Sequence, residues 1–142
     1  MIYTPKTKLA MRICFEAHKE QQDKSGMPYV FHPFHLAEQM QTEETTVVAL
    51  LHDVVEDTEC TIEDLMRLGF DRTITEAIAL MTHAEDVDYM DYVRAIKGNP
   101  IARVVKLADL RHNSDLTRLD RVDEKALRRR EKYLKAIALL EE

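Results

Sequence analysis

Residues 49–57 read ALLHDVVED, and this stretch decides the fold that the sequence predicts. On a helical wheel with about 100° per residue, the polar residues His52, Asp53, Glu56 and Asp57 fall on one side. The apolar residues of this segment and of the two positions before it fill the opposite arc: Val47, Val48, Leu50, Leu51, Val54 and Val55. An apolar face opposite a polar face is typical of a helix packed against a core. We therefore predict a helix over residues 43–57 that presents an imidazole and three carboxylates on its polar face.

Capping residues and apolar spacing predict further helices on both sides of this one. Thr4 is expected to cap the first helix, with Pro5 at its first position, and Asn99 with Pro100 forms a second start of this kind. Thr73 with Glu76 forms a capping-box pair, and Gly69 is expected to end the helix before it. The further helices are expected at residues 5–17, 33–40, 61–68, 73–81, 87–97, 101–113 and 124–140. Because the sequence has no sustained strand-like alternation, repeat or linker, we expect an all-α fold of about eight helices, forming a single domain over residues 1–142.

Composition excludes several classes of protein. The chain is 45% hydrophobic and 32% charged, as in ordinary globular proteins, and its apolar runs are too short for a transmembrane helix. The N-terminus lacks the apolar stretch of a secretory signal. Cys14 and Cys60 lie outside any CxxC motif, which favours reduced thiols and a cytoplasmic location.

The net charge of −6 argues against a general nucleic-acid binder, but the charge is unevenly distributed. Residues 38–91 contain fifteen acidic and two basic residues, a local balance of −13, so the remainder of the chain carries +7. An acidic segment of this kind either forms a solvated surface or holds cations.

The polar face of the 43–57 helix favours a bound cation. Exposed helix faces usually carry Lys or Arg at i±4, but none occurs between Glu43 and Met66. Three neighbouring carboxylates without a counter-ion repel one another and raise their own pKa values, and a divalent metal ion removes that repulsion. The alternative is that the carboxylates simply face water.

Further ligands are expected from other helices. His32 precedes Pro33 at a helix entrance, where it is either a ligand or only an N-cap-like residue. Lys106, Asp109 and Asn113 follow at i, i+3 and i+7, within about 60° of one another on the wheel. Because Asp109 lies among apolar residues, its carboxylate needs a partner, either a metal ion or a structural ion pair with Lys106 or Arg103.

Three blocks of the sequence, in this order, resemble one family. They are HKEQQDKSGMPYVFHP at residues 18–33, LHDVVEDT at residues 51–58 and KLADLRHN at residues 106–113. HD alone is a weak motif, but the three blocks together resemble the hydrolase domain of the RelA/SpoT alarmone enzymes, which are HD-domain phosphohydrolases. The resemblance implies a helical bundle with one divalent metal ion, usually Mn²⁺, in its cleft.

Carried over by position, the resemblance implies the metal ligands His32, His52, Asp53 and Asp109. This mixture of imidazole and carboxylate suits Mn²⁺ and does not exclude Fe, Co or Zn. The acidic pair after the HD motif corresponds to Glu56 and Asp57, which would orient or deprotonate the attacking water.

Four further residues match substrate contacts of the family. Lys24 and Lys106 would contact phosphate, and Tyr29 and Asn113 would contact ribose or base. The implied substrate is a small nucleotide, and the implied reaction removes the 3′-diphosphate of guanosine tetra- or pentaphosphate as pyrophosphate. We expect no synthetase activity. The alternatives are an HD-type phosphatase for another phosphorylated nucleoside and a nucleotide-binding module without turnover. The sequence leaves the oligomeric state open.

The sequence departs from the family pattern in two places. Asp23 stands where the family has an arginine that helps to hold the purine, so guanine specificity is not carried over. After KLAD the family reads Arg-Leu-His-Asn, whereas this chain reads Leu110-Arg111-His112-Asn113, and Arg111 is expected to point away from the cleft.

Three other histidines and one basic run stand outside this assignment. His18 matches a family histidine, but its place on an apolar stripe favours a hydrogen-bonded packing role, and His35 and His83 are unassigned. Residues 128–130 (RRR) are interpreted as part of a solvated helix face.

Overall fold

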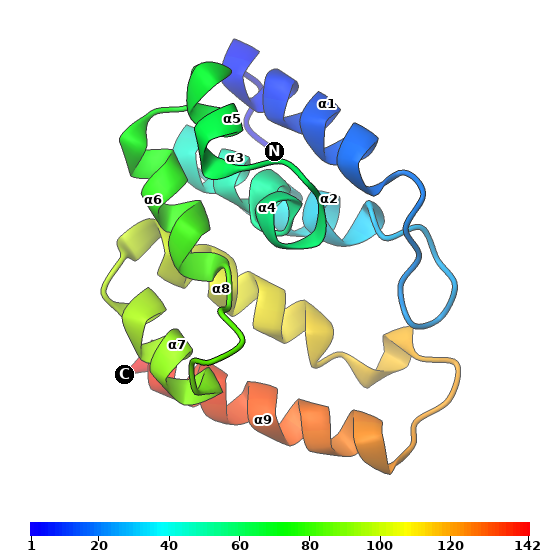
Figure 1. Cartoon of the computed structure of the whole chain (residues 1–142). Helices are drawn as coiled ribbons and strands as arrows, with labels where there is room; N and C mark the ends of the chain where they lie inside the picture. The colour runs from blue at the N-terminus through cyan, green and yellow to red at the C-terminus, as the bar shows by residue number, and fades with distance from the viewer.

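The structure is a computed structural model that describes residues 1–142, and all its regular elements are helices, apart from one isolated bridge between Gln22 and Pro28. Figure 1 shows their arrangement. The elements are α1 (Pro5–His18), α2 (Phe31–Glu38), α3 (Glu43–Leu51), α4 (Val54–Asp57), α5 (Ile62–Arg67), α6 (Arg72–Met81), α7 (Tyr89–Lys97), α8 (Pro100–Asn113), the 3-10 turn η1 (Leu116–Arg118) and α9 (Glu124–Glu141). The all-α prediction is confirmed. None of the helices is both long and apolar enough to cross a bilayer.

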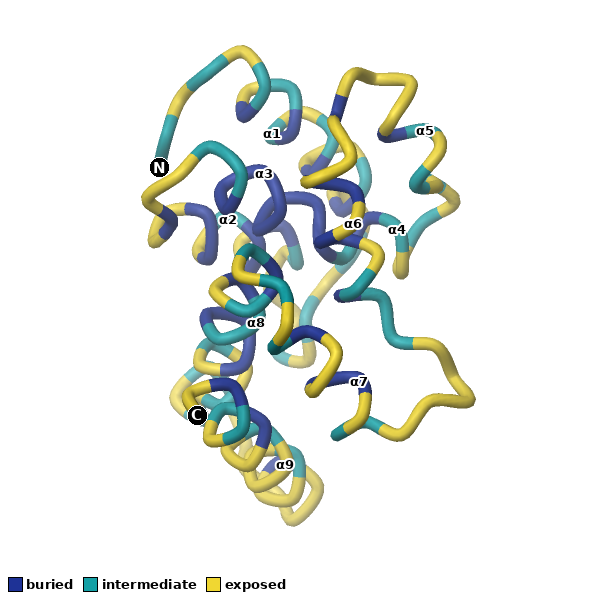
Figure 2. The backbone as a smooth tube through the Cα atoms, turned by 90° about the vertical axis from the view of Figure 1, so that its left-hand side faces the viewer, coloured by how far each residue is buried: buried dark blue, intermediate teal, exposed yellow.

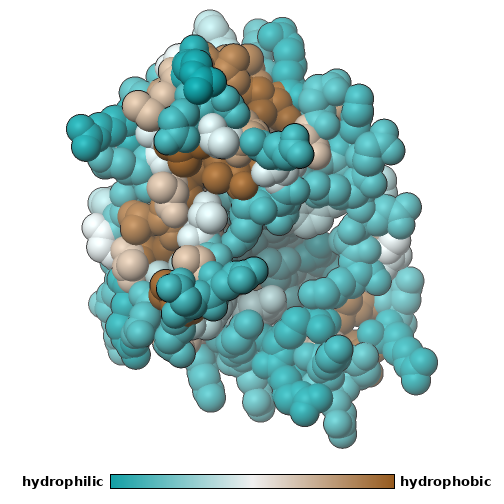
Figure 3. All heavy atoms as spheres, in the orientation of Figure 1, coloured by the Kyte–Doolittle hydropathy of each residue, from teal (hydrophilic) through white to brown (hydrophobic).

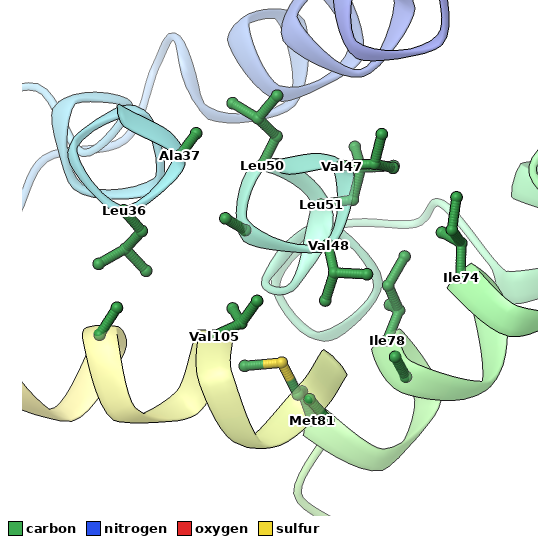
Figure 4. Packing of buried hydrophobic residues seen from close by; sticks show 14 of the residues in the cluster. Leu36, Ala37, Val47, Val48, Leu50, Leu51, Ile74, Ile78, Met81 and Val105 are labelled. Atoms are coloured by element: carbon green, nitrogen blue, oxygen red, sulfur yellow. The ribbon is translucent and has the colours of Figure 1, made fainter. Parts of the chain in front are cut away.

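Helix α3 occupies the centre of the bundle. It packs against α1, α2, α6 and α8, and every residue from Thr45 to Leu51 is buried (Figure 2). In Figure 4, Val48 points toward Ile78 and Met81 of α6, while Leu36 of α2 points toward α8. Because helices surround α3 on several sides, its predicted polar face is not open to solvent. The carboxylates of Glu56 and Asp57 reach the surface only after the helix ends.

The predicted helix over residues 43–57 is two helices, and this division explains why there are nine α-helices instead of about eight. α3 ends at Leu51, and Asp53 has φ −99° and ψ −6° before α4 begins. Nδ1 of His52 lies 2.7 Å from the carbonyl oxygen of Ala49. That oxygen is the acceptor that the Asp53 N–H would use in a continuous helix, so the imidazole competes with the backbone at this point.

The predicted starts of three other helices are wrong, and one of them is α7, which begins at Tyr89 and not at Val87 because Asp88 caps it. α2 begins at Phe31 and not at Pro33, because a proline within the first turn interrupts no helical hydrogen bond. α6 begins at Arg72, where the Asp71 side chain accepts from the N–H of Ile74, so Thr73 is not the cap. The predicted caps of α1 and α8 are confirmed, since Thr4 accepts from Thr7 and Asn99 accepts from Ile101 and Ala102.

Helices α8 and α9 form the side of the bundle opposite α1. α8 inserts Ala102, Val105 and Ala108 into the core and contacts both α3 and α9. α9 contributes Ala136 and Leu140 to the core, while most of its other residues are exposed (Figure 2). The buried apolar side chains form one continuous cluster, which fixes α2, α3 and α8 relative to one another. These three helices carry the residues of the candidate site.

We expect Leu50→Ala to lower the free energy of unfolding by about 2–5 kcal/mol, because it leaves a cavity beside a fully buried side chain of α3. Urea unfolding followed by circular dichroism measures this difference. Leu68→Ala is the matched control, because Leu68 is 49% exposed and its truncation leaves no internal cavity. Equal losses in the two variants would contradict the central position of α3.

Candidate functional site

Two histidines and one aspartate from different helices converge near the centre of the bundle. His32 lies in the first turn of α2, His52 directly follows α3, and Asp109 lies in the third turn of α8. Their side chains are at most 7% exposed. One ligand atom of each residue lies within 4.8 Å of the others, an arrangement that can hold a metal ion. Three of the four ligands expected from the sequence are therefore brought together.

The tautomer of His52 is fixed by the end of its own helix. The carbonyl oxygen of Ala49 can only accept, so Nδ1 of His52 carries the proton. Nε2 is buried and has no hydrogen-bond partner, yet Asp53 Oδ2 lies 3.1 Å and Asp109 Oδ1 3.7 Å from it. A neutral imidazole here directs a lone pair at two carboxylates. Only a proton or a metal ion at Nε2 makes this arrangement favourable.

His112 gives His32 a similar orientation. Nδ1 of His32 lies 2.7 Å from Nδ1 of His112, and Nε2 lies 2.8 Å from Asp109 Oδ1. Burial, together with the charge of Arg118, lowers the pKa of His112 to about 4, so this imidazole is neutral at pH 7. A neutral His112 can accept the proton on Nδ1 of His32, which leaves Nε2 of His32 free for a cation. Sequence reasoning missed His112, although its i+3 spacing from Asp109 places it on the same helix face.

Charge balance at the cluster favours a cation. Burial alone would raise the pKa of Asp109, but Lys106 and the two imidazoles hold it well below its ordinary value. Burial alone would lower the pKa of His52, but the charges of Asp53 and Asp109 raise it well above its ordinary value. The Asp109 carboxylate therefore stays ionised, while the imidazole of His52 attracts positive charge. Imidazole nitrogen and carboxylate oxygen are suitable donors for a divalent transition metal, so the residues present fit such an ion.

Asp109 forms the ion pair that the sequence left as one alternative, and its second oxygen faces the histidines that the other alternative, a metal site, requires. Its Oδ2 accepts from Nζ of Lys106 at 2.9 Å, which is the structural ion pair. Its Oδ1 faces His32 and also accepts from the side-chain amide of Asn113 at 3.0 Å. The ion pair therefore lies within the cluster and does not draw Asp109 away from the histidines.

Asp53, the fourth expected ligand, lies beside the cluster. Its Oδ2 accepts a hydrogen bond from the hydroxyl of Tyr29 and faces His52. Burial opposes ionisation of this carboxyl, yet the charge of His52 lowers its pKa to about 2. Asp53 is thus ionised and 16% exposed, although it is not one of the three residues whose ligand atoms lie within 4.8 Å of one another. Its role as a ligand stays a prediction.

Glu56 and Asp57 are exposed on α4, next to the cluster in sequence. Oε1 of Glu56 accepts from the backbone N–H of His83 at 3.0 Å, which ties this carboxylate to the segment after α6. Burial, with the charges of Asp53 and Glu56, raises the pKa of Asp57 to about 6. Asp57 therefore exchanges a proton near neutral pH.

A cavity of about 310 Å³ adjoins the cluster. Lys24, Tyr29 and Asn113, three of the four expected substrate contacts, line it, whereas Lys106 does not. Tyr29 and Asn113 connect it to the cluster, because they donate hydrogen bonds to Asp53 and Asp109. In the orientation of Figure 1, Figure 3 shows the molecular surface hollowed near its middle among mostly hydrophilic residues.

Sequence reasoning missed three large side chains that line the cavity: Arg118, Arg129 and Tyr133. Within residues 128–130, Arg129 alone is half-buried, so the interpretation of that run as a solvated face holds only for Arg128 and Arg130. The sequence contained an indication of this face, because helical spacing of i, i+3 and i+7 places three lining residues on one side of the helix: Ala126, Arg129 and Tyr133. Burial and the charges of Arg129 and Lys132 lower the pKa of Lys24, which indicates crowded cations that an anion would relieve.

Asp23, the first departure from the family pattern, stabilises a turn. Its Oδ1 accepts from the backbone N–H groups of Ser25 and Met27 at 2.9 and 3.0 Å. Gly26 has φ +79° in this turn, a conformation that favours glycine. Arg111, the second departure, pairs with Glu141 at 2.9 Å on the exposed side of α8, so it points away from the cluster as expected.

The remaining histidines have separate environments. His18 is fully buried, its Nδ1 donates to Oε1 of Gln21 at 2.8 Å, and its ring packs edge-on against Tyr29, which confirms its packing role. His35 stacks on His112 with ring centroids 4.1 Å apart. His83 stacks on Tyr92, and its Nε2 lies 2.6 Å from the carbonyl oxygen of Val87. It does not belong to the group of candidate metal ligands.

Comparisons with known proteins give related sequences and a related fold. No protein-family model matches the chain. It is 31% identical over 119 residues to the bifunctional (p)ppGpp synthase/hydrolase SpoT of Escherichia coli, covering 73% of this chain and 17% of that protein. It is 34% identical over 120 residues to the guanosine-3′,5′-bis(diphosphate) 3′-pyrophosphohydrolase MESH1 of Mus musculus, covering 73% of this chain and 66% of that protein.

A solved structure, described as a metazoan ortholog of SpoT that hydrolyzes ppGpp, has the same fold. Its TM-score is 0.74 at 24% identity, and the match covers 99% of this chain and 85% of that one. This chain spans less than a fifth of the length of the first curated relatives that it matches.

We expect His52→Ala to weaken binding of a divalent metal ion by more than about 100-fold, because it removes the unpartnered Nε2. Isothermal titration of chelator-treated protein with Mn²⁺ as the probe measures the affinity. His83→Ala is the control and should bind like the wild type, since its ring lies outside the cluster. Similar affinities for the two variants would contradict the assignment of the cluster as a metal site.

Proposed function

This chain belongs to the family of HD-domain (p)ppGpp hydrolases, and we propose that it is itself a metal-dependent nucleotide phosphohydrolase. The proposed substrates are guanosine tetra- and pentaphosphate, and the proposed products are GDP or GTP and pyrophosphate. One observation carries the proposal. His32, His52 and Asp109 converge with imidazole nitrogens facing carboxylates, directly beside a cavity lined by cationic side chains.

The proposed cofactor is one Mn²⁺ ion held by His32, His52, Asp53 and Asp109. Two nitrogen and two oxygen donors suit this ion, and both imidazoles have acceptors for their Nδ1 protons that orient Nε2 inward. When bound, such an ion lowers the pKa of a coordinated water molecule and offsets the negative charge of a phosphate.

Glu56 and Asp57 are proposed to receive the proton that the attacking water loses. The water oxygen forms a bond to the phosphorus next to the ribose, the bond from that phosphorus to the 3′ oxygen breaks, and the 3′ oxygen takes up a proton. An acceptor with a pKa of about 6, like Asp57, suits proton transfer near neutral pH. The bond from His83 N–H holds Oε1 of Glu56 in place and leaves the other carboxylate oxygen for the water.

Of the remaining proposed substrate contacts, the cationic residues are assigned to phosphate and the neutral residues to the ribose. Lys24 lies with Arg129 at the cavity, where crowding of positive charge favours a bound phosphate. Tyr29 and Asn113 lie between the cavity and the cluster and suit contacts to the ribose. Lys106 is held by Asp109 and lies 5.2 Å above the ring of Tyr92, so its proposed phosphate contact would be made beside the metal ion.

We expect the purified protein with Mn²⁺ to convert guanosine tetraphosphate to GDP and pyrophosphate, and to lose this activity after treatment with a chelator. The assay measures pyrophosphate and orthophosphate release from a panel of nucleotides. Orthophosphate release from other nucleotides alone would instead indicate a phosphatase for another phosphorylated nucleoside. Binding of Mn²⁺ and nucleotide without any turnover would indicate a non-catalytic binding module.

We expect Glu56→Gln to lower kcat by about 10²–10⁴-fold while Mn²⁺ affinity stays unchanged, because the amide can accept the His83 N–H but cannot accept a proton. Asp53→Ala should lose both metal binding and turnover. Steady-state kinetics and metal titration on the same preparations separate the two effects. An unchanged kcat in Glu56→Gln would leave Asp57 as the only candidate for the proton acceptor.

A further inference from the structure

Arg118 lines the cavity, and one end of its guanidinium is hydrogen-bonded to other residues. Its Nη1 donates to the carbonyl oxygen of His112 at 2.9 Å and to Oδ1 of Asn113 at 3.4 Å. Its Nη2 lies 3.8 Å from Oδ2 of Asp23, so the charge is paired as well. The side chain is only 26% exposed although it ends a short surface turn. A guanidinium held at Nη1 and facing a carboxylate in this way is oriented before any ligand binds, and its flat face stays free of hydrogen bonds.

Two separate segments of the chain hold this arginine in position. Oγ of Ser25 donates to the backbone carbonyl of Arg118 at 3.0 Å. Asp23, whose other oxygen closes the turn over residues 23–27, faces the guanidinium. Figure 1 shows this turn and the segment after α8 approaching each other at one end of the bundle. The position of Arg118 is therefore set independently of any ligand.

The three cationic side chains that line the cavity differ in the contacts that they make. Lys24 and Arg129 line the same cavity, and neither forms an ion pair with a carboxylate. They remain available for phosphate, whereas the charge of Arg118 already faces Asp23 and its Nη1 is already hydrogen-bonded. Its remaining surface suits a flat, delocalised partner, because a guanidinium stacks well on aromatic rings.

We propose that the face of Arg118 is the platform on which the base of the nucleotide stacks, and that Asp23 holds this platform in place. The inference rests on the proposed function, because it takes the ligand to be a nucleotide with its phosphates at the metal side. The free energy of stacking depends on the area of a base and not on the hydrogen-bond donors and acceptors along its edge. The platform therefore favours purines over pyrimidines and does not itself distinguish guanine from adenine.

The test compares two probes that the proposed reaction cannot hydrolyse: GDP, which has a base, and inorganic pyrophosphate, which has none. Their affinities for the Mn²⁺-loaded protein are measured by calorimetry. Arg118→Ala should weaken GDP and ADP about tenfold or more and leave pyrophosphate unchanged. Arg118→Lys keeps the charge but removes the flat face, so it should weaken GDP to a similar extent.

Three results would overturn the proposal: wild-type affinity for GDP in Arg118→Ala, recovery of GDP binding by Arg118→Lys, or an equal loss for pyrophosphate. Asp23→Asn preserves the backbone contacts of the turn and removes the charge beside Arg118. It should weaken GDP severalfold and leave pyrophosphate unchanged, and unchanged GDP binding would overturn the role of Asp23.

These measurements are independent of the proposed activity. A wild-type protein that binds GDP but does not hydrolyse guanosine tetraphosphate would contradict the proposed function and leave the stacking test intact. A wild-type protein that does not bind GDP at all would overturn the stacking proposal.

Discussion

The buried carboxylate of Asp109 is the constraint on which the rest of this structure depends. An unpaired charge at this depth costs several kcal/mol, so neighbouring helices must supply positive charge and hydrogen-bond donors. Lys106 and Asn113 do so from the same helix, and His32 does so from α2. These contacts require α2, α3 and α8 to meet, and the apolar residues of α3 provide the surface on which they meet. The polar centre and the apolar core therefore stabilise the same arrangement.

The interruption between α3 and α4 connects that arrangement to the proposed chemistry. The imidazole of His52 donates a hydrogen bond from Nδ1 to the carbonyl oxygen of Ala49. This bond ends α3 and turns Nε2 toward the carboxylates. The chain then restarts as a single turn that brings Glu56 to the backbone of His83 and leaves Asp57 at the surface. One side-chain hydrogen bond thus orients a proposed metal ligand and separates it from the two proposed proton acceptors.

The sequence predicts those features that local chemistry determines. Thr4, Asn99 and Gly69 mark helix ends because capping and a positive φ depend on a few neighbouring residues. The interruption at His52 was missed because helical periodicity continues through it. Arg118 and Arg129 were missed because their role arises only where distant segments meet. For Asp109 the sequence offered a metal site or an ion pair, and the fold contains the geometry for both because each oxygen faces a different group.

The bond between Ser25 and Arg118 joins positions 93 residues apart in the chain. Closing so long a loop carries an entropic cost that the two short turns cannot offset by themselves, so the assembled helices must hold them together. The cavity wall consequently has no stability of its own. A substitution that weakens helix packing far from the cavity should loosen ligand binding before it reduces helix content, and mild heat should have the same effect.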